Sequence, residues 1–134
     1  MSEIAKFVHH GMEKITPRVI EALLKKITFL KAEFTQLKAP KFPHLYEQLE
    51  FLADVVEDFA EGADKDIPFT AAAGAAFALL YAHQKMDLIP DFVVEYGHAD
   101  DSSVVRAVLI EHQRAFESYA DRHQLDFSKV TTRA

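Results

Sequence analysis

Four aspartates stand close together in two short segments, Asp87-Leu-Ile-Pro-Asp91 and Gly97-His-Ala-Asp100-Asp101. Carboxylate oxygens are the ligands that magnesium and calcium prefer in proteins, and manganese accepts them as well. The sequence therefore offers Asp87, Asp91, Asp100 and Asp101 as a candidate site for Mg, Mn or Ca. Their spacing does not match the Asp-x-Asp-x-Asp-Gly loop of EF-hand calcium sites.

The same aspartates also have an ordinary structural interpretation. Pro90 disfavours the helical conformation of the residue before it, so one helix must end there and a turn must follow. Aspartates beside a turn bond to backbone amides, and Asp100 and Asp101 stand where the next helix needs an N-cap. Both interpretations stay open at this point. A histidine ligand, His83 or His98, would shift a metal site toward manganese or zinc.

Other motifs for catalysis are missing from the sequence. The chain has no cysteine, which excludes thiolate metal sites, cysteine nucleophiles and disulfides. It has neither a glycine-rich phosphate loop nor a Gly-x-Ser-x-Gly elbow. Glu95 and His98 have the Glu-x-x-His spacing of di-iron bundles, but Gly97 interrupts the helix which that motif needs. We therefore expect a protein that is not an enzyme, with a metal-dependent hydrolase as the alternative.

The length and net charge of the chain limit the kinds of protein and of binding partner that the sequence allows. A chain of 134 residues, 49% of them hydrophobic, is the size of one domain with one core. Its net charge of −6 argues against nucleic acid as the main partner, because phosphate binding needs a positive surface. The longest apolar stretch, residues 67–82, is shorter than the ~20 residues that span a bilayer. With no signal peptide recognisable at the N-terminus, we expect a cytoplasmic protein.

Hydrophobic periodicity predicts the fold. Apolar residues recur at spacings of three and four along nearly the whole chain, which is the period of the α-helix. We expect an all-α, compact bundle of about five helices, at residues 2–10, 17–37, 45–59, 67–81 and 101–124. Gly11 would end the first helix, Thr16 and Pro17 would begin the second, and residues 125–134 would form a loosely held tail.

The faces of these helices can be assigned as well. The alanine-rich helix at 67–81 is apolar all round, so it belongs at the centre, and the carboxylate segment follows it. Residues 14–41 carry seven basic and two acidic residues, whereas residues 44–66 carry eight acidic residues and one basic residue. These two antiparallel helices should attract each other. The side chains expected on buried stripes are Ile20, Leu23, Ile27, Leu30, Phe34, Leu37, Leu45, Leu49, Leu52, Val56, Phe59, Val105, Leu109, His112, Phe116 and Tyr119.

Four short motifs follow one another at defined spacings: Leu80-Tyr81, Asp87-Leu-Ile-Pro-Asp91-Phe, Gly97, and Asp100-Asp101. Together they resemble the hallmark of the YkvA-like domain, a bacterial family of unknown function, over about residues 70–107. The resemblance implies a small helical domain, attached in some relatives to membrane segments, and it supplies no reaction. The chain departs from the hallmark at three places: Gln84-Lys85 replaces Ser-Pro, Val94 replaces a proline, and His98 replaces an apolar residue.

The function that we expect is a non-catalytic interaction or scaffold domain with an unidentified protein partner, because helical surface is plentiful and a nucleophile–base pair is not recognisable. A homo-oligomer is an open alternative. A divalent-metal module built on the four aspartates is the rival. Membrane association rests on the family analogy alone.

Overall fold

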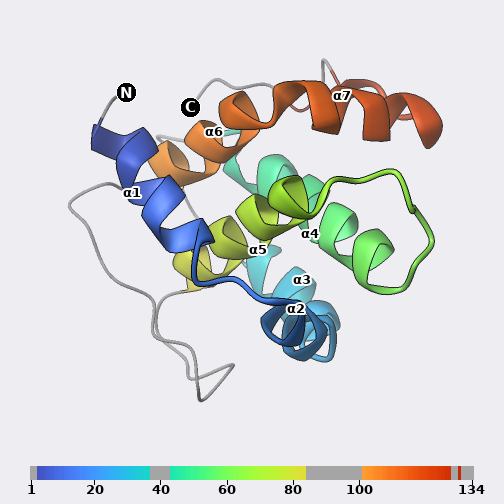
Figure 1. Cartoon of the computed structure of the whole chain (residues 1–134), viewed down its shortest axis with the longest axis horizontal. Coiled ribbons are helices and arrows are strands. Elements are labelled where there is room, and N and C mark those ends of the chain that lie inside the picture. The colour runs from blue at the N-terminus through green and yellow to red at the C-terminus, as the bar shows by residue number, and fades with distance from the viewer. Residues whose placement is uncertain (1–2, 37–42, 84–100, 128–129, 131–134) are drawn as a thin grey trace.

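The computed structural model describes residues 3–36, 43–83, 101–127 and 130. Within these ranges the chain folds into seven α-helices without a β-strand, which confirms the all-α fold (Figure 1). The helices are α1 (Glu3–Met12), α2 (Pro17–Leu24), α3 (Ile27–Phe34), α4 (Leu45–Ala60), α5 (Phe69–His83), α6 (Asp101–Glu111) and α7 (Gln113–Arg122). None of these described helices is long and apolar enough to cross a membrane.

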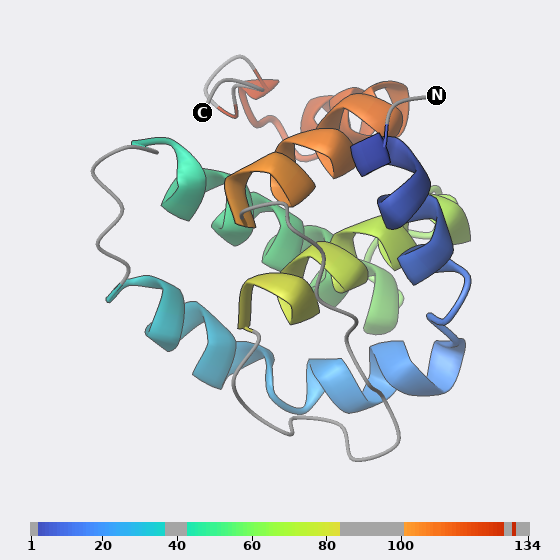
Figure 2. The same cartoon turned by 90° about the vertical axis from the view of Figure 1, so that its left-hand side faces the viewer.

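The alanine-rich helix α5 lies at the centre, as its composition predicts. Every residue from 71 to 81 is buried, and α5 contacts α1, α2, α4 and α6. Figures 1 and 2 show α6 and α7 above the α4–α5 pair, and α2 and α3 below it. Small side chains on α5 allow this close approach: the His112 ring rests against Gly74, where a β-carbon would lie 2.9 Å from its Cδ2 atom.

The number of helices differs from the prediction because two of the five expected helices are each divided in two. The first break is at Lys25 and Lys26, where the N–H of Lys26 bonds to the carbonyl of Leu23 in a tighter turn. The expected stripe nevertheless faces the core on both sides of this break, from Ile20 to Phe34. Hydrophobic spacing was therefore read correctly, and only the continuity of the helix was wrong.

The second break is at His112, between α6 and α7, where the backbone leaves the helical region (φ −114°, ψ 28°). The break redirects the chain so that Phe116 and Tyr119 of α7 reach the ring of Phe51 on α4, with ring centroids 5.8 and 5.6 Å away. Aromatic packing between distant segments thus accounts for a bend that local sequence does not signal.

Gly11 does not end the first helix, and that prediction was wrong. It lies inside α1, is buried, and faces the ring of Phe77, whose Cε1 atom would be 2.2 Å from an added β-carbon. The glycine is therefore required for close packing of α1 on α5. The start of the next helix is as predicted: Thr16 Oγ1 accepts a hydrogen bond of 3.2 Å from the N–H of Val19, and Pro17 is the first helical residue.

The attraction between the basic and acidic segments is visible at Lys31. Its Nζ atom on α3 lies 2.8 Å from Oδ1 of Asp54 and 3.0 Å from Oε1 of Glu57, both on α4. Burial alone would lower the pKa of this ammonium, but hydrogen bonds and the charges of the two carboxylates outweigh it and raise the pKa. Opposite charge therefore pairs α3 with α4, as expected.

Candidate functional site

The aspartates that the sequence singles out fall largely beyond the described residues. Asp87, Asp91 and Asp100 lie outside them, and Asp101 is the first residue of α6, with a side chain that is not described. Within the described ranges, the structure contains no group of three or more His, Asp or Glu side chains that could hold a metal ion. The metal site proposed from the sequence therefore stays a prediction.

His83 is the last described residue before Asp87. It is the last residue of α5, and its side chain is 3% exposed. Its Nδ1 atom hydrogen-bonds to Oε1 of Glu33 on α3, while its Nε2 atom is buried and has no hydrogen-bond partner among the described residues. The Phe29 ring meets it edge-on at 6.1 Å. The Glu33 carboxylate thus holds the His83 ring through Nδ1, and Nε2 is available for a further bond.

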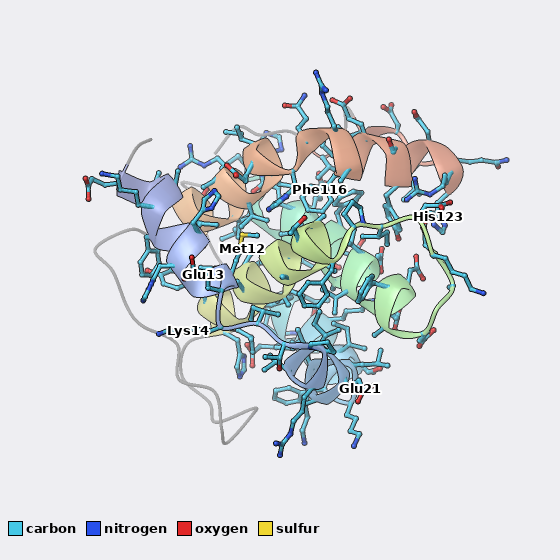
Figure 3. All side chains as sticks on the ribbon, viewed as in Figure 1. Met12, Glu13, Lys14, Glu21, Phe116 and His123 are labelled. Atoms are coloured by element: carbon cyan, nitrogen blue, oxygen red, sulfur yellow. The ribbon has the colours of Figure 1, made fainter. Side chains whose placement is uncertain are left out.

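A second polar cluster has a structural role. Asp64, in the loop between α4 and α5, has a side chain only 3% exposed, and its Oδ2 atom lies 2.9 Å from Nε of Arg122 and 2.8 Å from Nε2 of His123. Its Oδ1 atom accepts the N–H of Asp66 at 2.9 Å. Burial opposes ionisation, but these hydrogen bonds prevail and lower the pKa of Asp64 to about 2. Figure 3 shows His123 at the end of α7, beside this loop.

The same helix is held by a second bond. Tyr119 donates its hydroxyl proton to Oδ2 of Asp58 on α4 at 2.5 Å, and burial together with this carboxylate raises the pKa of Tyr119. Because Asp58 and Asp64 each accept a hydrogen bond from a side chain of α7, anchoring of this helix explains the shifted pKa values of Tyr119 and Asp64. We assign them no catalytic role.

An open groove lies between α4 and the segment after α7. It has a volume of about 530 Å³ and is lined by Glu47, Glu50, Phe51, Asp54, Gln124, Leu125, Asp126 and Val130. The α4 residues recur at helical spacing, so they share one face of the helix. Phe51 forms the floor and packs edge-on against Phe127 at 5.7 Å, while Leu125 at the rim is 45% exposed.

The side chains that line this groove carry mainly negative charge. Four of the eight lining side chains are carboxylates, and none of the described residues lining it is basic. Lys31 binds Asp54 from the neighbouring helix and compensates part of this charge. Tyr46 donates to Oε2 of Glu50 at 2.6 Å, and this bond, with the carboxylate charges, raises the pKa of Tyr46. The groove combines an apolar floor with a negative rim.

Sequence reasoning interpreted the acidic residues of α4 first as partners for the basic segment, with an acidic face for a cationic partner as the alternative. The missed signal is that Glu47, Glu50, Asp54 and Glu57 recur at spacings of three and four, so they form one acidic stripe along α4, and Lys31 binds its last two members. The sequence did not indicate the opposite wall of the groove, because residues 125–134 were expected only to form a loosely held tail. Of these residues, Phe127 and Val130 pack against the core.

No protein-family model, no curated protein and no solved structure matches the chain. The resemblance of the aspartate motifs to the YkvA-like family therefore stays a prediction from the sequence.

Proposed function

We propose that the chain is a non-catalytic interaction domain that binds a basic, amphipathic helix of a partner protein. The observation that carries this proposal is the groove of about 530 Å³ between α4 and the described residues after α7, with its four carboxylates around an apolar floor. Helices that dock in grooves place apolar side chains on the floor and are selected by complementary charge at the rim. A basic amphipathic helix meets both requirements at once.

The exposed residues around the groove favour a protein over a small ligand. Tyr46 and Leu125, 36% and 45% exposed, are two of the exposed large hydrophobic residues of the molecule, and both lie on the segments that form the groove. Aromatic and aliphatic side chains at a rim commonly contribute to protein interfaces. With Glu47 and Glu50 beside Tyr46 on α4 and Leu125 on the opposite wall, the surface offers both apolar area and negative charge.

Binding of a synthetic probe tests the proposal. The probe is a fluorescent helical peptide of leucine and lysine in an amphipathic order, compared with a scrambled peptide of the same composition and with a leucine–glutamate analogue. Fluorescence anisotropy should show saturable binding of the ordered basic peptide alone. Glu47→Gln with Glu50→Gln should weaken it about three- to tenfold, because each exposed ion pair contributes up to ~1 kcal/mol.

A charge-matched control separates the groove from the general acidity of the chain. Glu21→Gln with Glu117→Gln removes the same charge from exposed positions on α2 and α7. This control should leave the affinity unchanged, whereas Leu125→Ser should weaken binding without any change in charge. Equal losses in the control and groove variants, or equal binding of the scrambled peptide, would overturn the proposal. Light scattering at rising concentration shows whether a second copy of the chain is the occupant instead.

A divalent-metal module is the second candidate function, and His83 is the observation that favours it. A histidine that binds a metal usually donates its other ring N–H to a carboxylate, which fixes the ring and its tautomer. The Glu33–His83 bond has this form, and the buried Nε2 atom stands four residues before Asp87. We infer that any metal held by Asp87, Asp91, Asp100 and Asp101 would accept this nitrogen too, which favours manganese or zinc over calcium.

Thermal unfolding tests the metal module. The melting temperature is measured after EDTA treatment and then with added magnesium, manganese, calcium or zinc. A specific site raises stability by mass action, about 2.7 kcal/mol at a hundredfold excess over the dissociation constant. The gain should be lost in Asp87→Asn and reduced in His83→Gln. If no ion changes the melting temperature, the aspartates act as caps and turn formers.

A further inference from the structure

A second cavity, separate from the groove, lies where α1, the start of α5 and the α6–α7 break meet. It encloses about 390 Å³, within the size range of small-ligand sites. Figure 3 shows Met12 at the end of α1, on the side that faces α5 and α6. The residues that line it are His9, Met12, Glu13, Phe69, Thr70, Ala73, Glu111 and His112.

The walls of this cavity are mainly apolar. Met12 and Ala73 supply aliphatic surface, and Phe69 supplies an aromatic ring that is 39% exposed. The Phe69 ring is steadied by that of Phe59, 6.0 Å away. Such walls suit the hydrocarbon body of a ligand, and an aromatic ring face also attracts cations.

The charged groups at the cavity give it a negative balance. Glu13 and Glu111 contribute two carboxylates, and the described lining residues include no lysine or arginine. His9 is the basic residue of the α1 side, and its Nε2 atom is engaged with Oε1 of Glu111 at 2.6 Å. Burial lowers the pKa of the His112 imidazole, so this ring adds no stable positive charge. The charge of Glu111 opposes this lowering of the pKa, and His9 adds to it.

We propose that this cavity binds a small organic cation, an ammonium group on an apolar body. The apolar body occupies the space between Met12, Phe69 and Ala73. The ammonium group lies at the α1–α6 rim, where Glu13 and Glu111 neutralise it and the ring of Phe69 adds a cation–π contact. A neutral ligand of the same shape forms no ion pair with these carboxylates, and an anion is repelled by them. The proposal is independent of the groove and its protein partner.

Three probes with the same aromatic body and different charge test the proposal: phenethylamine, phenethyl alcohol and hydrocinnamate. Selective labelling of methionine methyl groups gives an NMR reporter inside the cavity, since the chain has only 3 methionines and Met12→Leu assigns the signal. Phenethylamine should shift the Met12 methyl signal in a saturable titration. The alcohol should bind about three- to tenfold more weakly, and the carboxylate should cause no shift.

Two variants locate the binding. Glu13→Gln with Glu111→Gln should lower the affinity for phenethylamine to that of the alcohol. The groove variant, Glu47→Gln with Glu50→Gln, removes equal charge elsewhere and should leave it unchanged. Equal affinity for all three probes, an unmoved Met12 signal, or an equal loss in the groove variant would overturn the proposal. Because the cavity variants change exposed or half-buried carboxylates, circular dichroism readily confirms that they remain folded.

Discussion

Asp64→Asn is the substitution whose consequence follows most closely from the structure. Asparagine keeps the shape of the side chain and an oxygen for the N–H of Asp66, but it removes the charge that Arg122 and His123 share. The wild-type pKa of Asp64 falls from 3.8 to about 2, and each unit is worth about 1.4 kcal/mol. Since both partners are 30% exposed, solvent screens part of this energy. We expect a loss of about 1–2 kcal/mol at neutral pH.

The loss should depend on pH in a defined direction. The folded-state pKa of Asp64 lies below its ordinary value, so the stabilisation is complete above about pH 4 and disappears as the pH falls toward 2. Near pH 3, about half of the difference between wild type and variant should be gone. Urea unfolding followed by circular dichroism at several pH values measures both proteins.

A matched control is Asp121→Asn, an exposed aspartate on α7 that should change stability little at any pH. A difference between wild type and Asp64→Asn that stays constant from neutral pH to pH 3 would refute the reasoning, because it would show that the charge of Asp64 does not hold α7.

Two further predictions concern packing around α5. Gly11→Ala should lower the free energy of unfolding by about 1–3 kcal/mol, because the methyl group collides with the buried ring of Phe77; urea unfolding that shows a gain, as expected at an exposed helical glycine, contradicts this. His112→Leu should raise the melting temperature at neutral pH, since the buried Nε2 atom has no hydrogen-bond partner among the described residues. Its advantage should grow as the pH falls below 6.5, because burial lowers the pKa of His112 and wild type then loses stability; a constant advantage contradicts this.

The sequence predicted the buried faces better than the course of the chain. Ile20, Leu23, Ile27 and Leu30 are all buried, because hydrophobic spacing records burial directly. The break at Lys25 leaves that spacing intact and carries no proline or glycine, so nothing local announces it. Such breaks are decided by contacts between distant segments, which a single sequence does not display.

The candidate sites show the same difference between features that depend on local spacing and features that depend on contacts between distant segments. The aspartates of the motif were found because they are close in sequence, and they remain a prediction. The cluster of Asp64 with Arg122 joins residues 58 positions apart, and the pair of His9 with Glu111 joins residues 102 apart. Neither pairing can be inferred from spacing. The groove was missed for the same reason, since Leu125 meets α4 only in the folded chain.

The most direct test of the interaction function is to locate the basic amphipathic peptide on the protein by methyl NMR. The proposal predicts shifts of the Leu125 and Val130 methyl signals that saturate with the same dissociation constant as the anisotropy measurement. Glu47→Gln with Glu50→Gln should raise this dissociation constant about three- to tenfold. Shifts centred on other helices, or spread evenly over the surface, would show that the groove is not the binding site and would contradict the proposed function.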